Sequence, residues 1–147
     1  MRILILNGPN LNLIGKREPH IYGSVSFDDF LADLRKRYDS QAIEHVQSND
    51  ESVLIDQIQD AENHYNGVII NAGAYTHTSI AISDAIHFCG IPVVEVHISN
   101  IYAREVYRRK SYLSEVCIGS ICGFGLDSYR LAVESLLSMN NASKKTI

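Results

Sequence analysis

Residues 2–7 read Arg-Ile-Leu-Ile-Leu-Asn, and Gly8 and Pro9 follow them directly. Four consecutive apolar residues that end at a turn are typical of a β-strand buried on both faces of a parallel sheet, because such a strand exposes no side to water. Similar short runs recur along the chain at residues 42–46, 68–70, 92–96 and 116–121. The sequence therefore predicts five strands, of which the first is the most apolar.

Helical patterns fill the intervals between these runs. Apolar residues at helical spacing predict helices over residues 27–38, 53–61, 78–88, 102–109 and 127–137. Ser26 precedes Asp29 by three residues and Ser48 precedes Glu51 by three, and each pair predicts a capping box where a helix begins. Alternating strands and helices predict an α/β fold, a flavodoxin-like three-layer sandwich with a five-stranded parallel sheet in the order 2-1-3-4-5.

Length and composition place limits on what the chain can be. Its 147 residues suit one domain, with a core over residues 1–139 and a polar, frayed tail at 140–147. The net charge of -4 argues against nucleic acid as a partner, and no apolar run approaches the ~20 residues that cross a membrane. The first apolar run is too short for a signal peptide, and the odd count of three cysteines predicts free thiols. A cytoplasmic location is therefore expected.

In a sheet with this strand order, ligands bind beyond the carboxyl ends of the strands, near the switch point between the first and third strands. The loop at residues 7–23 follows the first strand and is far longer than the usual two to six residues, as is typical of a lid or binding loop. Residues 71–79 follow the third strand with small side chains and lead into a helix N-terminus, which favours anions and polar oxygens.

His97 ends the fourth predicted strand, and Glu95 lies two residues before it. Side chains two residues apart on a strand share a face, so the pair predicts a histidine oriented by a carboxylate. Basic residues follow within one loop, at Arg104, Arg108, Arg109 and Lys110. The candidates for acid–base chemistry at these strand ends are Arg17, Tyr22, His77, Glu95, His97 and Arg108.

Several other functions lack the residues that they need. The first and third strands end in Asn7 and Asn71, where a receiver domain needs acids, and the sequence contains no P-loop, nicotinamide fingerprint, nucleophile elbow or zinc-ligand spacing. The five lysines lie in polar contexts, unlike a lysine that forms a Schiff base. Acid–base chemistry without metal or cofactor is the favoured interpretation. A flavodoxin-like nucleotide- or flavin-binding module is the alternative, and a scaffold without chemistry is a third possibility.

Three motifs then indicate a family. They comprise residues 7–13 with 17–19 and 22–23, residues 71–73 with 76–79, and residues 95–100 with Arg104. On these motifs the chain, to about residue 137, resembles the type II 3-dehydroquinate dehydratases. The resemblance implies a hydro-lyase of the shikimate pathway, which leads to chorismate and the aromatic amino acids. It further implies a homododecamer, a tetramer of trimers, that dehydrates 3-dehydroquinate to 3-dehydroshikimate through an enolate with no metal or cofactor.

The resemblance also implies roles for individual residues. Tyr22 is the general base, with Arg17 beside it, and His97 is the general acid, oriented by Glu95. Asn10 holds a water at the enolate oxygen. The hydroxyls and carboxylate of the substrate are held by Asn71, His77, the Ile98 backbone, Ser99 and Arg108, and Asp84 reaches the substrate of a neighbouring subunit.

A tyrosine base needs electrostatic help. The ordinary pKa of a tyrosine is about 10, so forming tyrosinate at pH 7 costs roughly 4 kcal/mol. A cation within a few ångströms lowers the pKa of such a group by about one to three units. Arg17 is five residues from Tyr22 in the same loop, and arginine keeps its charge. We therefore hypothesise that closure of this loop brings Arg17 to Tyr22 only around bound substrate.

Overall fold

The computed structural model describes residues 1–15 and 25–144, and within them the strands form one parallel sheet. The strands are β1 (Arg2–Asn7), β2 (Ala42–Gln47), β3 (Gly67–Asn71), β4 (Val93–His97) and β5 (Gly119–Cys122). Their order is β2-β1-β3-β4-β5, and every pairing is parallel. The predicted strand order is therefore confirmed.

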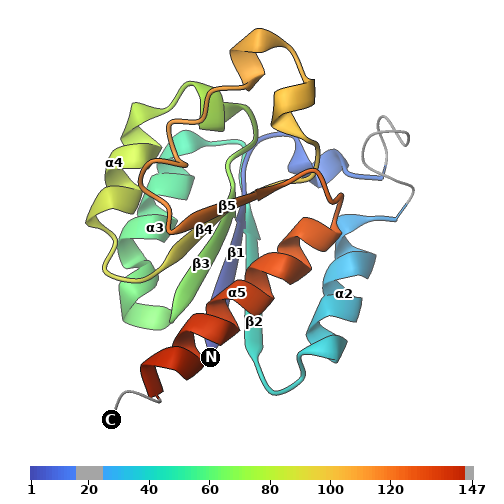
Figure 1. Ribbon diagram of the computed structural model, residues 1–147, viewed down its shortest axis with the longest axis vertical. Helices are drawn as coiled ribbons and strands as arrows, with labels where there is room; N and C mark the ends of the chain where they lie inside the picture. The colour runs from blue at the N-terminus through green and yellow to red at the C-terminus, as the bar shows by residue number, and fades with distance from the viewer. Residues whose placement is uncertain (16–24, 145–147) are drawn as a thin grey trace.

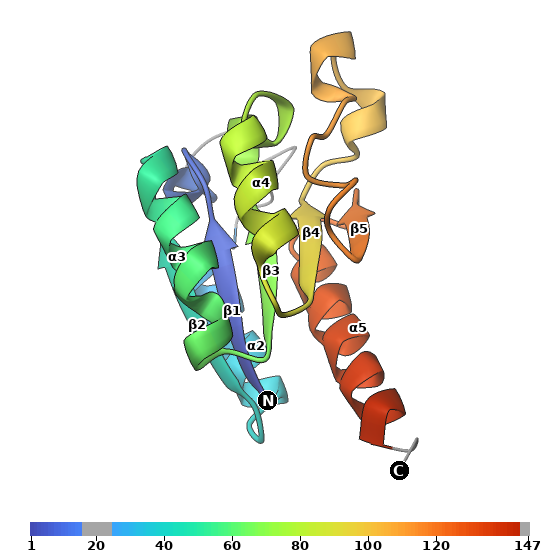
Figure 2. The same cartoon turned by 90° about the vertical axis from the view of Figure 1, so that its left-hand side faces the viewer.

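Helices cover both faces of the sheet. Helices α2 (Phe27–Arg37) and α5 (Asp127–Lys144) lie on one face, and α3 (Glu51–His64) and α4 (Ile80–Phe88) lie on the other (Figure 1). In Figure 2, α3 and α4 lie toward the viewer and α2 lies behind the sheet. The predicted three-layer α/β sandwich is confirmed.

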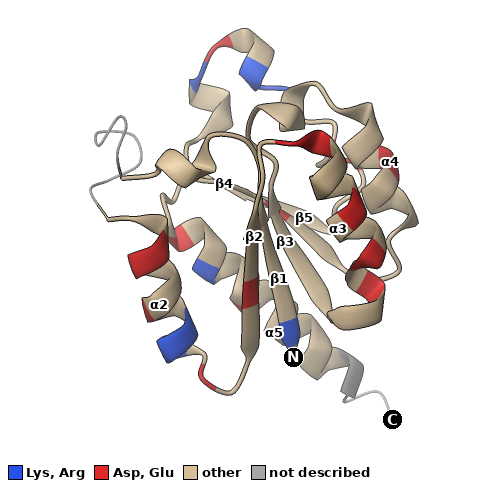
Figure 3. Cartoon of the chain, turned by 180° about the vertical axis from the view of Figure 1, so that it is seen from behind, with Lys and Arg blue, Asp and Glu red and all other residues tan. Residues whose placement is uncertain are grey.

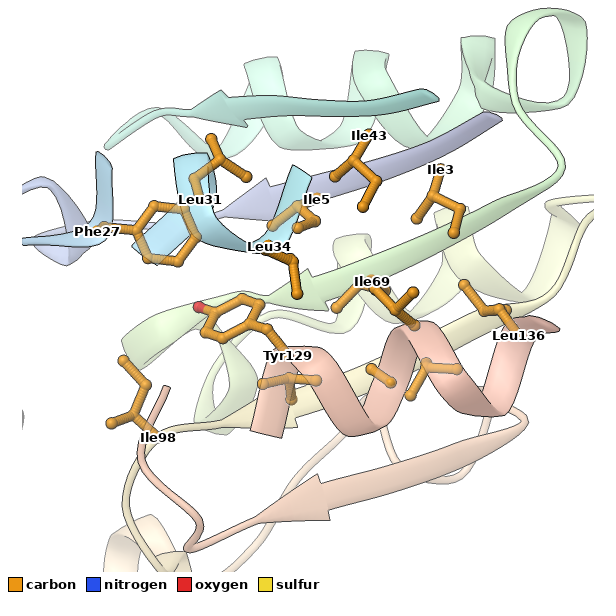
Figure 4. Close-up of a cluster of buried hydrophobic side chains, with 14 of the residues drawn as sticks. Ile3, Ile5, Phe27, Leu31, Leu34, Ile43, Ile69, Ile98, Tyr129 and Leu136 are labelled. Atoms are coloured by element: carbon orange, nitrogen blue, oxygen red, sulfur yellow. The ribbon is translucent and has the colours of Figure 1, made fainter. Parts of the chain in front are cut away.

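The side chains of β1 alternate between two apolar cores. Ile3 and Ile5 pack with α2 and α5, and Leu4 and Leu6 pack with α3 and α4. All four side chains are fully buried, as the sequence predicts for a strand covered on both faces. Figure 4 shows the first of these cores, in which the ring of Tyr129 lies among the aliphatic side chains and its hydroxyl points toward the arrowhead ends of the strands.

Ser26 is the N-cap of α2, as the first of the two predicted capping boxes requires. Ser26 accepts a hydrogen bond at its Oγ from the backbone N–H of Asp29, 3.1 Å away, and donates to the Asp29 carboxylate at 2.7 Å. The second prediction is wrong, because Asp50 caps α3 by accepting from the N–H of Ser52 at 3.0 Å. Ser48 instead accepts from the N–H of Asp50, so it stabilises the turn that precedes the helix.

The predicted helix over residues 102–109 is also wrong. The segment forms two short 3-10 turns, η3 (Ile101–Ala103) and η4 (Val106–Arg108). Arg104 has φ -98° and ψ -172°, and Glu105 has φ -59° and ψ 148°, so both are extended and the helical hydrogen bonds cannot continue between the turns. The segment after β4 therefore makes two separate turns instead of one helix.

The last strand and the last helix have boundaries other than those predicted. The last strand begins at Gly119 rather than at Val116, because the N–H groups of Val116 and Cys117 both donate to the carbonyl of Leu113 in a turn. Helix α5 continues to Lys144, beyond the core boundary expected at residue 139. No helix in the described ranges is both long and apolar enough to span a membrane.

Candidate active site

A cavity of about 630 Å³ opens at the carboxyl ends of β1, β3 and β4. Three loops build it: residues 9–14, which include the 3-10 turn η1 (Leu11–Leu13), residues 71–77, which include η2 (Gly73–His77), and residues 97–108. The cavity lies where the strand order reverses, as expected of ligand sites in such sheets. Seven predicted site residues line it: Asn10, Asn71, His77, His97, Ile98, Ser99 and Arg108.

Beneath the cavity, β4 presents the predicted histidine–carboxylate pair. The Nε2–H of His97 donates to Glu95 Oε1 at 2.9 Å, and both side chains are buried. Two serines complete the set of donors, Ser111 Oγ to Oε1 at 2.6 Å and Ser120 Oγ to Oε2 at 2.7 Å. Burial alone would raise the pKa of Glu95, but the hydrogen bond and charge of His97 and the serine hydroxyls outweigh burial and hold that pKa below its ordinary value. The carboxylate is therefore ionised.

His77 stands beside this pair on the same wall of the cavity. Its Nδ1 lies 2.7 Å from the carbonyl oxygen of Lys110. A carbonyl only accepts, so Nδ1 carries the proton and Nε2 is the nitrogen left for a ligand. The rings of His77 and His97 stack with their centroids 6.3 Å apart. The cavity thus presents one imidazole bound to a carboxylate and one bound to a backbone carbonyl.

Asn71 is fixed by a buried chain of hydrogen bonds. Its Nδ2 donates to the hydroxyl of Tyr129 at 2.9 Å, and that hydroxyl donates to Asn7 Oδ1 at 2.8 Å. Burial raises the pKa of Tyr129 well above its ordinary value, so the phenol stays protonated as this donation requires. The Nδ2 of Asn7 lies 3.2 Å from His45 Nε2, and burial lowers the pKa of His45, so a neutral ring can accept there. The chain joins α5 to the ends of β1 and β3.

The loops after β1 and β3 lie in direct contact. A Cβ on Gly8 would stand 2.4 Å from the carbonyl oxygen of Ala72, so the loops can approach this closely only with glycine at residue 8. Asn10 has a left-handed φ of 67°, and its N–H donates to Asn49 Oδ1 at 3.0 Å. Asparagine tolerates this backbone conformation better than most residues do. These contacts define the floor and one rim of the cavity.

A cationic rim faces this floor from the loop that follows β4, at the top of Figure 3. Arg104 and Arg108 line the cavity, and Glu105 Oε2 lies 3.7 Å from Arg104 Nε and 3.2 Å from Arg108 Nε. The latter is an ion pair without a well-aligned hydrogen bond, because the buried Nε of Arg108 has no hydrogen-bond acceptor within the described residues. The two guanidinium groups therefore bring positive charge to this rim of the cavity, which favours an anionic ligand.

The remaining predicted residues are placed differently. Tyr22 and Arg17 lie outside the described residues. Asp84 is exposed on α4 and does not line this cavity; its predicted role concerns a neighbouring subunit. Among residues 1–15 and 25–144, no cluster of three histidines, cysteines or acids is arranged to hold a metal ion.

Sequence reasoning missed several contributors. Arg104 belongs to one of the three motifs without a predicted role, and the cavity also has an apolar wall that the prediction lacks, formed by Leu11, Leu13, Ile14 and Ile101. The apolar residues in the long first loop were the available signal for that wall. Ser111, Ser120 and Tyr129 had no local signal, because their partners lie far away along the chain.

A buried acid–base pair, fixed amides and arginine side chains at the carboxyl edge of a 2-1-3-4-5 sheet define an α/β enzyme for a small anionic substrate. The chain belongs to the class II dehydroquinase family, whose model matches residues 1–137. The members of this family are hydro-lyases of the shikimate pathway. This membership decides against the nucleotide- or flavin-binding module and the scaffold.

Individual relatives agree with the family assignment. A 3-dehydroquinate dehydratase of Exiguobacterium sp. is 58% identical over 138 residues, which cover 93% of this chain and 94% of that protein. The type II dehydroquinase of Butyrivibrio crossotus has 43% identity and a TM-score of 0.86, with 92% of this chain and 97% of that chain covered. The enzyme of Propionibacterium acnes has 41% identity and a TM-score of 0.87, with 93% and 96% covered. Fold and family therefore agree over nearly the whole chain.

Proposed function

We propose that the cavity catalyses the reversible dehydration of 3-dehydroquinate to 3-dehydroshikimate through an enolate, as a cytoplasmic step of the shikimate pathway. The observation that carries the proposal is the buried pair of His97 and Glu95 facing a cavity that also presents arginine donors. Family membership supplies the substrate and the reaction. The pair supplies what the dehydration needs, a proton donor beside a space large enough for a small cyclic acid.

In the proposed mechanism, Tyr22 removes the proton next to the ketone, and the electron pair of that bond forms the enolate. The enolate then collapses, the carbon–oxygen bond of the leaving hydroxyl breaks, and His97 protonates that hydroxyl so that water departs. The Nε2 of His97 is engaged by Glu95, which leaves Nδ1 as the nitrogen for this transfer. Tyr22 then releases its proton to solvent and His97 takes one up from solvent, which restores both groups for the next cycle.

The other groups bind substrate or stabilise charge. Asn10 holds a water at the enolate oxygen, where a hydrogen bond strengthens as charge develops. The hydroxyls and the carboxylate are held by Asn71, His77, the Ile98 backbone, Ser99 and Arg108. All of these residues line the cavity, which supports the assignment. Arg108 is suited to the carboxylate because its side chain lines the cavity and the planar guanidinium matches carboxylate geometry.

Arg17 activates Tyr22 in this proposal, because a nearby cation lowers the pKa of a phenol. Both residues belong to the long loop between β1 and α2. Closing the loop around substrate would bring Arg17 to Tyr22, so that the tyrosinate forms only when substrate is bound. An Arg17→Ala variant should lose turnover, and retention of the wild-type kcat would contradict this role.

The working assembly in this proposal is a homododecamer, a tetramer of trimers. Helix α4 supports association, because Ile80 and Phe88 are 61% and 83% exposed on it. Asp84 lies on the same helix, and in this proposal its carboxylate reaches the substrate in the cavity of the neighbouring subunit. Light scattering should give twelve times the mass of one chain. Mixing Asp84→Asn and His97→Ala subunits should restore part of the activity, because some cavities then have both residues.

The decisive experiment follows the ultraviolet absorbance of the conjugated enone after purified protein is added to 3-dehydroquinate. Parallel samples contain a chelator or borohydride, which inactivate metal-dependent and imine-dependent enzymes respectively. We expect absorbance to grow in every sample and to be lost in Tyr22→Phe. Tyr102→Phe is the matched control, because Tyr102 is an exposed tyrosine that does not line the cavity. No growth from folded wild-type protein would contradict the proposal.

A further inference from the structure

Glu95 lies in a cradle of three donors that come from three segments of the chain. His97 lies on the same strand, Ser111 lies in the loop after η4, and Ser120 lies on β5. Their donor atoms are 2.9, 2.6 and 2.7 Å from the carboxylate oxygens. The carboxylate is fully buried, and a buried charge without such partners would strongly destabilise the fold.

We propose that Ser111 and Ser120 are positioning residues for the proton transfer, acting through Glu95 to keep one carboxylate oxygen aligned on His97 Nε2. The inference rests on the proposed function, in which His97 is the general acid. Neither serine lines the cavity, so neither is suited to touch the substrate. Their effect on the reaction would pass entirely through Glu95.

The two serines hold opposite ends of the carboxylate. Ser111 donates to Oε1, the oxygen that also accepts from His97, and Ser120 donates to Oε2. A carboxylate held at both oxygens cannot rotate about its terminal bond without breaking a hydrogen bond to a charged group. The oxygen facing the imidazole therefore stays in place while the histidine loses and regains its proton.

The hydrogen bond from Ser111 has a fixed direction. Its Oγ accepts from the N–H groups of Leu113 and Ser114, each at 3.0 Å. A serine hydroxyl has two lone pairs and one hydrogen, so both lone pairs are occupied and the hydrogen is committed to Glu95. Ser111 cannot accept a hydrogen bond from a protonated Glu95. The arrangement thus favours the carboxylate over the carboxylic acid.

Ser120 connects the last strand of the sheet to this site. Residues 95 and 120 are partners in the parallel pairing of β4 with β5, which brings the serine hydroxyl over the carboxylate. The titratable neighbours of Glu95 are His97 and Cys117. Burial and the charge of Glu95 raise the pKa of Cys117 to about 12, so its thiol stays neutral. The carboxylate therefore has one ionisable hydrogen-bond partner, the imidazole, among the residues described around it.

The test compares Ser120→Ala, Ser120→Thr and Ser111→Ala with the wild-type enzyme. Removing a donor leaves more negative charge on the carboxylate behind the imidazole, so the basic limb of the kcat–pH profile, where the Glu95–His97 pair loses the proton that it donates, should move to higher pH. We expect kcat of Ser120→Ala to fall on the order of tenfold with KM within about twofold, and Ser120→Thr to restore it because threonine keeps the hydroxyl. Ser111→Ala should show a larger loss in the same direction.

Ser135→Ala is the matched control, because Ser135 donates to the Leu131 carbonyl on α5 and touches neither Glu95 nor the cavity. Thermal unfolding of each variant separates stability from alignment. An active wild type with unchanged kcat and pH limb in Ser120→Ala and Ser111→Ala would overturn the inference alone. A lower unfolding temperature of these two variants, with the limb of the kcat–pH profile unmoved, would also overturn the inference. An inactive wild type would overturn the proposed function and, with it, this inference.

Discussion

The imidazole rings of His77 and His97 lie almost parallel, at an interplanar angle of 17° and a centroid separation of 6.3 Å. Their partners differ, since His97 donates to the carboxylate of Glu95 and His77 to the carbonyl of Lys110. An imidazolium beside a carboxylate is stabilised by charge, whereas one beside a carbonyl gains only a dipole. The structure therefore distinguishes the two histidines by the group behind each ring, a carboxylate for His97 and a backbone carbonyl for His77.

Substitution of these histidines should affect different kinetic constants. His97→Ala should lower kcat by about 10²–10⁴, because a general acid is lost from the transition state. His77→Ala should mainly raise KM, because its proposed hydrogen bond to a substrate hydroxyl exists before and during the reaction. Steady-state kinetics on both variants measures the difference. Equal losses of kcat would contradict the assignment of acid and binding roles.

Removing the hydroxyl of Tyr129 should break the chain of hydrogen bonds below the cavity and lower the stability of the fold. Tyr129→Phe leaves Asn7 Oδ1 and Asn71 Nδ2 without their partner, so the free energy of unfolding should fall by about 1–3 kcal/mol. Tyr38→Phe removes an exposed hydrogen bond to Glu134 and should change the free energy of unfolding by less than about 0.5 kcal/mol. Denaturant titration compares the two. Similar losses of unfolding free energy in both variants would show that burying the Asn71–Tyr129–Asn7 hydrogen bonds contributes little to stability.

The contact between the first two cavity loops should not tolerate a methyl group. Gly8→Ala places a Cβ 2.4 Å from the carbonyl of Ala72, and the backbone must shift to relieve it. We expect a loss of about 1–3 kcal/mol in unfolding free energy, together with a lower kcat because Asn10 moves with the loop. Gly119→Ala is the control, because nothing lies within 4 Å of its Cβ position. A Gly8→Ala enzyme with wild-type stability would contradict the contact.

Acid should weaken the fold through His45. Burial lowers the pKa of this histidine, so the folded state disfavours its proton and the unfolded chain binds it more readily. Stability should therefore fall as the pH drops below the ordinary histidine pKa of about 6.5, until the lowered pKa of the folded state is passed. Unfolding midpoints at pH 7.5 and 5.5 should differ less for His45→Gln than for the wild type. His87→Gln, an exposed substitution, should keep the wild-type difference.

The sequence predicts those parts of the site that depend on local periodicity. Glu95 and His97 are two residues apart on a buried strand, so their shared face follows from strand geometry alone. The hydrogen bonds from Ser111 and Ser120 to Glu95 span 16 and 25 residues, and nothing near either serine indicates a carboxylate partner. Such contacts depend on how the chain returns to β4 after η3 and η4, where helical spacing predicts one continuous helix and the chain makes two separate turns.

The hydrogen bond from Tyr129 to Asn7 joins residues 122 positions apart. During synthesis the first strand leaves the ribosome early, but the hydroxyl that completes its end is among the later groups to emerge. Ser111 and Ser120 also follow the histidine that they support through Glu95. A nascent chain can therefore pair its early strands without possessing a formed cavity floor. Catalytic competence should arise late in translation, when α5 docks, and chains released before that point should be inactive.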